Sequence, residues 1–243
     1  MAIWKKFHKD GIPEYLARNY WWAYVWSFGI WFWDHQPIVN MILFGNYRKL
    51  INATVARYRK LKPQNTLQIS GVYGRITPEL ALELKDNDFH LVDITNGQLV
   101  SARKKLAAQK ETEKFAGNLS RMNAENMAYP DNSFDSVLIF FLLHELPPDV
   151  RKTILAEAVR VVKPGGSIIV TEYGERTKTH FFHTFFLSRW ILGYFEPFVP
   201  AFIAENLTDN LNESAKTVNK EIEHIDTKII FRGFYRNAEF KVK

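Results

Sequence analysis

Between residues 64 and 177, segments with the pattern of β-strands alternate with segments that have the pattern of α-helices. The strand-like segments are 66–72, 89–94, 136–143 and 166–172, and the helix-like segments are 77–85, 96–110 and 149–162. Such alternation predicts right-handed βαβ units around a mostly parallel sheet. The third strand is apolar at every position from 137 to 143, as expected of a strand covered on both faces. The predicted fold class is therefore α/β.

Two more strand-like runs lie near the end of the chain. They cover residues 227–234 and 238–242, with Arg236-Asn237 as the predicted turn, and they follow a polar helix-like stretch near 206–222. Strands joined by a short turn pair in the antiparallel sense. We therefore expect a C-terminal antiparallel hairpin to complete the sheet.

The first quarter of the chain differs from the rest in charge and aromatic content. Residues 1–60 contain nine Lys and Arg against three Asp and Glu, which equals the net charge of +6, and they hold six of the seven tryptophans. Basic residues among Trp and Tyr suit a membrane surface; a nucleic-acid surface and an ordinary core-packing helix are the alternatives. We predict an aromatic, basic helical cap or membrane-docking segment over 1–62. The α/β domain then covers 63–243, with an aromatic substrate or membrane insertion at 178–204.

Several functional classes are excluded or disfavoured. The longest uncharged run, residues 19–33, has fifteen residues, whereas a membrane-spanning helix needs about 20. The first eleven residues lack the apolar core of a signal peptide. The chain has no cysteine, so disulfides, cysteine-ligated metal centres and a cysteine nucleophile are excluded.

Motifs in the α/β part occur in a recognisable order. The stretch AYPDNSFD at 128–135 precedes the apolar strand, Leu143-His144 follows it, and VKPGGS at 162–167 joins a helix to the last parallel strand. This series resembles the class I S-adenosylmethionine-dependent methyltransferases over roughly residues 64–177. The resemblance implies a Rossmann-like sheet and S-adenosyl-L-methionine as the cofactor.

The first loop departs from that family's pattern. Family members end the first strand in an acid and a glycine-rich turn, D-x-G-x-G-x-G, where the backbone approaches the cofactor closely. Here the stretch from Gln68 reads QISGVYG, so only Gly74 matches a glycine of the pattern. Val72 and Tyr73 would crowd the groove or reposition the methionine moiety. The alternative is a decayed site that binds nothing.

Two other positions match the family's cofactor contacts. Asp93 ends the second strand, where an acid binds the ribose hydroxyls; a helix N-cap is the alternative for a single Asp there. Asn123-Ala124-Glu125 resembles the family's stretch that touches adenine. The predicted cofactor-binding residues are Gln68, Ser70, Gly71, Val72, Tyr73, Gly74, Asp93, Asn123, Ala124 and Glu125.

A closer resemblance rests on the N-terminal block. The stretches YWWAY at 20–24, DHQPIVN at 34–40 and ILFGNY at 42–47, with GVYG at 71–74 and FFLLHE at 140–145, are similar to the rhodoquinone-biosynthesis methyltransferase-like enzymes. This resemblance implies conversion of ubiquinone to rhodoquinone, in which an amino group replaces a ring methoxy group. It also implies S-adenosylmethionine as the amino donor, a divalent manganese ion, and a cytoplasmic protein peripherally associated with the inner membrane.

Candidate catalytic residues lie in three places. Tyr73 belongs to the altered loop, and His144-Glu145 follow the central strand at the rim where ligands bind in α/β sheets. Imidazole can act as a general base or a metal ligand, but a packing role for His144 is the alternative. Asp34-His35 form a second carboxylate–imidazole pair, or a surface pair without a catalytic role. The metal ligands are left open among Asp34, His35, Asp93, His144 and Glu145.

The leading hypothesis is an enzyme that aminates a membrane quinone, with ubiquinone and the membrane surface, rather than nucleic acid, as its partners. A quinone or lipid O- or C-methyltransferase with a drifted first motif is the first alternative. A non-catalytic subunit of a quinone-synthesis complex and a nucleic-acid methyltransferase are the others.

Overall fold

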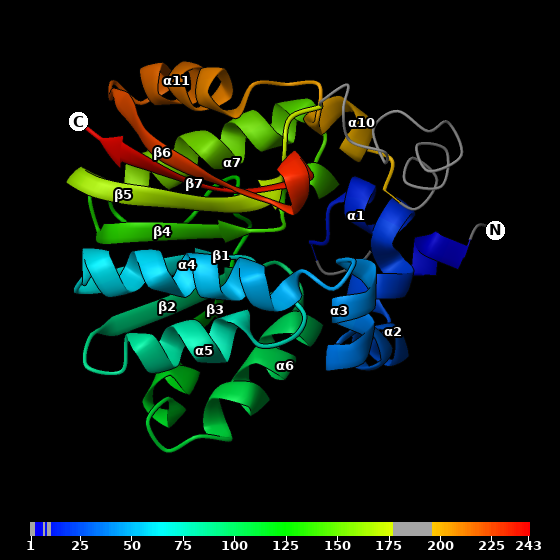
Figure 1. Ribbon diagram of the computed structural model, residues 1–243. Helices are drawn as coiled ribbons and strands as arrows, with labels where there is room; N and C mark the ends of the chain where they lie inside the picture. The colour runs from blue at the N-terminus through cyan, green and yellow to red at the C-terminus, as the bar shows by residue number, and fades with distance from the viewer. Residues whose placement is uncertain (1–2, 7, 9–10, 177–195) are drawn as a thin grey trace. The chain divides into compact units, whose positions relative to one another are not determined.

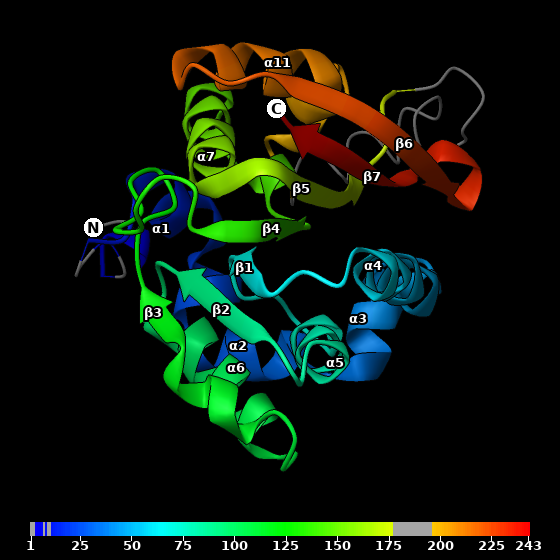
Figure 2. The same cartoon turned by 90° about the vertical axis from the view of Figure 1, so that its left-hand side faces the viewer.

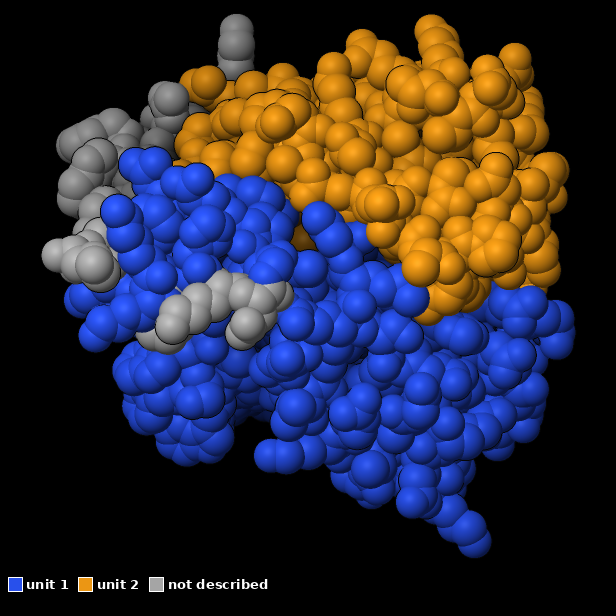
Figure 3. Space-filling view, turned by 180° about the vertical axis from the view of Figure 1, so that it is seen from behind, with its two compact units in different colours: residues 1–124 blue, residues 125–243 orange. Residues whose placement is uncertain are grey.

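The structure is a computed structural model that describes residues 3–6, 8, 11–176 and 196–243. The contacts within the chain divide it into two compact units, residues 1–124 and residues 125–243, which Figure 3 shows in different colours. The predicted boundary at 62/63 falls inside the first unit and stays a prediction. Most of the expected insertion at 178–204 lies outside the described residues.

Helices make up the start of the first unit (Figure 1). A cap or membrane-docking role for residues 1–62 stays a prediction. A π-helical turn at Trp21–Val25 separates the first two α-helices. The helices are α1 (Glu14–Tyr20), α2 (Ser27–Trp33), α3 (Gln36–Ile42) and α4 (Tyr47–Leu61), after a 3-10 turn at Ile3–Lys6. No helix in the described part of the chain is long and apolar enough to cross a membrane.

Parallel strands and helices complete the first unit. The strands are β1 (Asn65–Ile69), β2 (Asp88–Asp93) and β3 (Leu119–Arg121). β2 pairs in parallel with β1 and with β3. The helices are α5 (Ile76–Glu83) and α6 (Asn96–Ala107), with a 3-10 turn at Glu113–Gly117 before β3. Helix α6 contacts both α2 and the π-helical turn, so the N-terminal helices pack against the α/β part of their own unit.

The second unit holds a four-stranded sheet in the order β4-β5-β7-β6. The strands are β4 (Phe134–Phe140), β5 (Val162–Tyr173), β6 (Ile222–Ile230) and β7 (Tyr235–Val242). The helices are α7 (Pro148–Val161), α10 (Val199–Phe202) and α11 (Leu207–Thr217). Helices α7 and α11 pack together on one face of these strands (Figure 2).

The sheet confirms the predicted fold class. Strands β4 and β5 pair in parallel, whereas β7 is antiparallel to both β5 and β6. The α/β fold with mostly parallel strands and a C-terminal antiparallel hairpin is therefore as predicted. The apolar run of the central strand is buried, because Val137, Leu138 and Ile139 have no exposed surface.

The turn of the terminal hairpin was predicted in the wrong place. Arg236 and Asn237 lie inside β7, opposite Glu172 and Thr171 of β5. The chain instead reverses at the 3-10 turn Phe231–Gly233, where Phe231, Arg232 and Gly233 all have positive φ. Phe and Arg carry no local preference for that conformation, whereas an Arg-Asn pair has the polarity of an ordinary turn. The composition therefore indicated the wrong dipeptide.

Candidate functional site

The first loop begins at the end of β1 with a residue in an unusual conformation. Ser70 has a φ of 73°, a value that favours glycine, and it occupies the position of a family glycine. Its hydroxyl donates to Asp93 Oδ2 at 3.1 Å, and the backbone N–H of Gly71 donates to the same oxygen at 2.7 Å. The loop thus keeps a glycine-like course although its sequence has changed.

Asp93, at the end of β2, is saturated with hydrogen bonds inside the chain. Its Oδ1 accepts from the backbone N–H and the hydroxyl of Thr95, at 2.7 and 2.6 Å. Burial raises the pKa of Asp93, and the hydrogen bonds from Thr95, Gly71 and Ser70 oppose that shift. A carboxylate offers about four acceptor sites. A ribose diol could therefore bind here by replacing the rotatable hydroxyls of Ser70 and Thr95.

Two residues of the N-terminal helices hold the second half of the loop. The N–H of Gly74 donates to Asp34 Oδ1 at 2.7 Å. The Tyr47 hydroxyl accepts from the N–H groups of Arg75 at 2.6 Å and Ile76 at 3.2 Å, and it donates to the carbonyl of Tyr73 at 3.1 Å. Burial is the main cause that raises the pKa of Tyr47. Sequence reasoning missed Tyr47, because nothing in its neighbourhood indicates a contact 26 residues away.

Glycine at position 74 is required by this arrangement. Gly74 has a φ of 81°, and a Cβ there would lie 2.3 Å from the Tyr47 hydroxyl. Real Cβ atoms do not approach another atom so closely, so a side chain at 74 would displace the tyrosine. The one glycine that the family pattern shares with this loop is therefore fixed by contacts within the chain.

The side chain of Tyr73 packs against the N-terminal helices. Its ring stacks on Tyr24, with the centroids 5.4 Å apart and the planes 14° from parallel. Its hydroxyl donates to the carbonyl of Ala23. The hypothesis that Tyr73 repositions the methionine moiety stays a prediction, and these contacts define what its variants would remove.

Two buried amide atoms around the loop support a polar ligand there. The Nε2 of Gln68 donates to the carbonyl of Ser70 at 2.9 Å and to the Thr77 hydroxyl at 3.0 Å. Its Oε1 has no partner among the described residues, and neither has Nε2 of Gln98. The Cβ of Gln98 would lie 3.1 Å from a Cβ at Gly71. One free acceptor and one free donor beside the loop are what a polar cofactor could satisfy, so this region fits S-adenosylmethionine.

The predicted adenine contact lies in the loop after β3. Asn123, Ala124 and Glu125 are all half-buried, and the N–H of Met122 donates to the carbonyl of Asp93 at 3.1 Å. This bond fixes the start of the 123–125 loop against the end of β2. The 123–125 loop after β3 therefore begins beside Asp93 at the end of β2.

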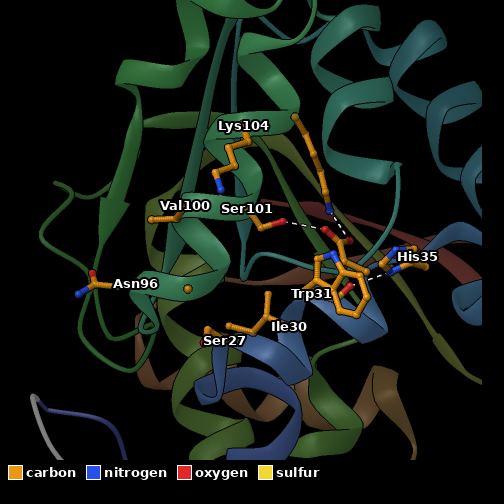
Figure 4. Close-up of a pocket in the computed structure, with 11 residues that line it drawn as sticks. Ser27, Ile30, Trp31, His35, Asn96, Val100, Ser101 and Lys104 are labelled. Atoms are coloured by element: carbon orange, nitrogen blue, oxygen red, sulfur yellow. Dashed lines mark hydrogen bonds and ion pairs between the residues drawn. The ribbon is translucent and has the colours of Figure 1, made fainter.

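Asp34 and His35 border a pocket of about 670 Å³ between α2 and α6 (Figure 4). Asp34 accepts from the Ser101 hydroxyl at 2.7 Å and pairs with Lys105 Nζ at 2.5 Å. Burial lowers the pKa of Lys105, and the charge of Asp34 opposes that shift. Asp34 is thus occupied by the loop, by Ser101 and by Lys105.

His35 is exposed and interacts with Trp31 rather than with Asp34. Its Nδ1 lies 2.8 Å from the Trp31 carbonyl, and its ring meets the Trp31 ring edge-on at 4.7 Å. Figure 4 shows Trp31 and Ile30 on the α2 side of the pocket and Val100, Ser101 and Lys104 on the α6 side.

His144 and Glu145 lie in the second unit, in a 3-10 turn at Leu143–Glu145 directly after β4. Nδ1 of His144 is 2.9 Å from Glu172 Oε1, and Nε2 is 3.8 Å from Glu145 Oε1. Burial alone would lower the pKa of His144, but the negative charges of Glu172, Glu196 and Glu145 raise it to about 9. Burial would likewise raise the pKa of Glu172, and the charge and hydrogen bond of His144 outweigh this and lower it.

The metal-ligand candidates from the sequence are only partly brought together. In the described part of the chain, the group of three potential ligands whose donor atoms all lie within 4.8 Å is His144, Glu145 and Glu196. An imidazole with two carboxylates suits a divalent transition metal, so this donor set fits manganese. Sequence reasoning missed Glu196 and Glu172. Glu196 had one signal, because it is the only acidic residue between 178 and 204.

Comparison with known proteins gives a consistent result. Residues 67–170 match the family described as methyltransferase domain. The ubiquinone/menaquinone biosynthesis C-methyltransferase UbiE of Pseudoalteromonas translucida is 30% identical over 139 residues, 56% of this chain and 53% of that protein. The corresponding protein of Rickettsia akari is 27% identical over 213 residues, 86% of this chain and 81% of that protein.

Solved structures support the same fold. The PH0226 protein from Pyrococcus horikoshii superposes with a TM-score of 0.56 at 14% identity, over 96% of this chain and all of that one. A S-adenosylmethionine-dependent methyltransferase from Aquifex aeolicus gives 0.54 at 16% identity, over 89% and 97%. The match spans about half the length of the first curated relative. Together these likenesses support a class I, S-adenosylmethionine-dependent methyltransferase fold.

Proposed function

We propose that this protein is an S-adenosylmethionine-dependent enzyme that acts on a membrane quinone, and that it converts ubiquinone to rhodoquinone by replacing a ring methoxy group with an amino group. The relatives named as ubiquinone/menaquinone biosynthesis C-methyltransferases support a quinone substrate. The resemblance in the N-terminal block and in the 71–74 loop supports the rhodoquinone reaction.

The observation that carries this proposal is the state of the first loop. Its N–H groups at Gly71 and Gly74 already donate to Asp93 and Asp34, and those at Arg75 and Ile76 donate to Tyr47. These N–H groups are therefore engaged within the chain, and they could reach the methionyl end of the cofactor only by exchanging partners. The proposed reaction requires the cofactor to present its α-amino group, rather than its sulfonium methyl, to the ring.

In this proposal the chain's own residues bind and orient the cofactor. Asp93 accepts the ribose hydroxyls in place of Ser70 and Thr95, and the free Nε2 of Gln98 donates to the cofactor beside Gly71. Residues 123–125 lie against the adenine. A divalent ion, manganese in the proposed reaction, would polarise an oxygen of the quinone ring when bound.

Exposed apolar side chains support access to a quinone dissolved in a membrane. Large apolar residues on and around α2 and α3 are exposed to solvent: Trp26, Phe28, Trp31, Phe32, Met41, Ile42 and Phe44. Such a concentration on a basic segment is typical of a surface that docks on lipid. We infer a peripheral protein of the cytoplasmic face of the inner membrane.

A quinone C-methyltransferase is the second candidate, favoured by the 30% identity to enzymes of that name. It would use the same cofactor and the same class of substrate, but it would transfer the methyl group. The two functions differ in product alone.

The decisive experiment is expression in a host that makes only ubiquinone, followed by mass spectrometry of the lipid extract. Rhodoquinone supports the proposal, and a methylated quinone in its place supports the second candidate. If the protein is folded and membrane-bound in the host but the lipid extract contains neither product, the result contradicts both candidate functions. Asp93→Asn serves as the cofactor-binding variant, with Asp88→Asn at the opposite end of β2 as the control.

Tyr73 variants test the role of the altered loop in the same assay. Tyr73→Phe removes the bond to Ala23 and keeps the stack on Tyr24, whereas Tyr73→Gly removes both. If the ring sets the reactive geometry, Tyr73→Gly lowers rhodoquinone per folded enzyme at least tenfold while cofactor affinity stays within a few fold. A constant yield per folded enzyme in both variants would show that Tyr73 only stabilises the fold.

A further inference from the structure

The cluster His144, Glu145 and Glu196 is built from two separate segments of the second unit. His144 and Glu145 belong to the turn after β4, and Glu196 lies just before α10, more than 50 residues later in the sequence. One oxygen or nitrogen of each side chain lies within 4.8 Å of the others. His144 is 4% exposed and Glu145 8%, while Glu196 is half-buried, so the cluster is largely enclosed but can be reached from solvent.

Glu172 fixes the orientation of the imidazole. Its carboxylate lies 2.9 and 3.0 Å from His144 Nδ1, and it accepts the backbone N–H groups of Leu143 at 2.8 Å and Tyr173 at 2.9 Å. Because the Glu172 carboxylate only accepts hydrogen bonds, Nδ1 is the donor in this pair. The other ring nitrogen, Nε2, lies on the side of Glu145, 3.8 Å from its Oε1. A histidine that binds a metal through one nitrogen commonly donates its other N–H to a carboxylate in this way.

Aromatic residues surround the imidazole. Tyr173 and Phe141 meet the ring of His144 edge-on, at 4.8 and 5.8 Å. Phe141 has a φ of 50°, a strained conformation of the kind found at functional sites. Tyr235 packs against both Tyr173 and Phe141, and its buried hydroxyl has no partner among the described residues. This hydroxyl is a hydrogen-bond donor available to a molecule bound nearby.

The geometry points to a mononuclear site: we propose that Nε2 of His144 and one carboxylate oxygen each of Glu145 and Glu196 bind a divalent transition-metal ion, with Glu172 as a positioning residue. The role of this ion in the quinone reaction rests on the proposed function, whereas metal binding itself does not. A nitrogen ligand distinguishes it from the all-oxygen sites that Mg²⁺ and Ca²⁺ prefer.

Three protein ligands leave coordination positions open. An ion that takes about six ligands would accept water there, or a substrate with oxygen atoms on neighbouring ring carbons. The chemistry of the open positions therefore favours a substrate ring with adjacent oxygens, as a methoxylated quinone has.

The competing explanation is that His144 is an imidazolium that pairs with these carboxylates and binds no metal. Both explanations use the same contacts, so metal binding itself has to be measured. Mn²⁺ is a suitable probe, because its electron paramagnetic resonance signal in water is lost when the ion binds to a protein. The full-length protein is first treated with a chelator and then titrated with Mn²⁺, without quinone or S-adenosylmethionine.

The variants are Glu145→Gln and Glu196→Gln, which keep the shape of the side chain, and Glu172→Gln. We expect one Mn²⁺ per wild-type chain and an affinity at least tenfold weaker in each ligand variant. We expect Glu172→Gln to weaken binding roughly 10–100-fold, as other losses of an orienting partner do. Glu213→Gln, an exposed carboxylate paired with Lys152, is the matched control and should bind like wild type.

Two results would overturn the site: no Mn²⁺ binding by the wild type at millimolar concentration, or equal binding by wild type and both ligand variants. Displacement of Mn²⁺ by equimolar Mg²⁺ would contradict the nitrogen ligand, whereas displacement by Zn²⁺ supports it. If Glu172→Gln fails to fold, the half-buried Glu196 still tests the site. Because no quinone is present, a failed site leaves the rhodoquinone assay untouched, and intact Mn²⁺ binding without rhodoquinone would contradict the proposed function alone.

Discussion

At the scale of single residues, Tyr47 is the feature with the clearest energetic consequence. Its hydroxyl makes three hydrogen bonds with the first loop. Tyr47→Phe would leave the N–H groups of Arg75 and Ile76 without their acceptor, so we expect a loss of about 1–3 kcal/mol in the free energy of unfolding. Denaturant unfolding followed by circular dichroism measures it.

Tyr235→Phe is the matched control for that variant. Tyr235 is equally buried, but its hydroxyl has no partner among the described residues. Removing an unpaired buried hydroxyl should leave the free energy of unfolding unchanged or raise it slightly. Equal losses in the two variants would contradict the role assigned to the Tyr47 hydroxyl.

Ser70 offers a second test at this scale, because its φ of 73° is costly for any residue with a Cβ. Both Ser70→Ala and Ser70→Gly lose the hydroxyl bond to Asp93. A residue with a Cβ in the left-handed conformation destabilises the folded state by about 1–2 kcal/mol. Glycine avoids this strain, but it lowers the free energy of unfolding by about 0.4–1 kcal/mol because it gives the unfolded chain more conformational freedom. We therefore expect the glycine variant to be as stable as the alanine variant or more stable, measured by thermal unfolding.

Ser101 provides the control for this comparison. It lies inside helix α6, where alanine should be more stable than glycine by about 1 kcal/mol. The same order at Ser70 would mean that the backbone there is not left-handed.

At the scale of elements, α2 is the part of the cap that we expect to bind lipid. Phe28 and Trp31 are 52% and 59% exposed, whereas Trp21 and Trp22 in the π-helical turn are half-buried. Changing Trp26, Phe28 and Trp31 together to Ser should weaken binding to vesicles of phosphatidylglycerol and phosphatidylethanolamine roughly tenfold. Co-sedimentation with vesicles measures the change.

The control uses exposed apolar residues elsewhere. Ile225 and Ile229 on β6 are 46% and 59% exposed, so the variant with Ser at both positions removes apolar surface of similar exposure. It should bind vesicles like the wild type. If both variants lose binding equally, general surface hydrophobicity rather than α2 would be responsible.

The elements also show what a sequence pattern can and cannot predict. The strand expected at 136–143 occurs as β4, Phe134–Phe140, because an unbroken apolar run is a strong signal. Strand β3, Leu119–Arg121, was not predicted, since three residues with one buried side chain show no periodicity. The turn at Phe231–Gly233 depends on left-handed residues that composition does not reveal.

The same limit applies to the site. Asp93 and the 70–74 loop were predicted as cofactor contacts because they follow strands directly, at the rim where α/β sheets bind ligands; their role stays a prediction. Tyr47, Gln98, Glu172 and Glu196 were missed, because each acts through a contact made by the tertiary fold rather than by a local motif. Their detection required the positions of elements in space.

At the scale of the whole molecule, cofactor binding should appear as stability. A ligand at 100 times its dissociation constant adds about 2.7 kcal/mol to the free energy of unfolding, which for a chain of this size raises Tm by roughly 5–10 °C. We expect S-adenosylhomocysteine to produce such a shift in the wild type and in Asp88→Asn, as measured by differential scanning fluorimetry.

Asp93→Asn should show no shift at the same ligand concentration, because the amide replaces a charged acceptor with a neutral one. A shift of wild-type size in that variant would contradict ribose binding by Asp93. No shift in the wild type would favour the hypothesis of a non-catalytic subunit.

The bonds from Asp34 and Tyr47 to the 73–76 segment have a consequence for evolution and for engineering. If the first 62 residues were grafted from a relative that lacks Asp34 and Tyr47, the N–H groups of Gly74, Arg75 and Ile76 would lose their acceptors, unless the relative's own loop was grafted with them. We therefore expect chimeric proteins to fold well only when residues 1–62 and 70–76 are exchanged together, so that these two stretches are inherited as a single unit.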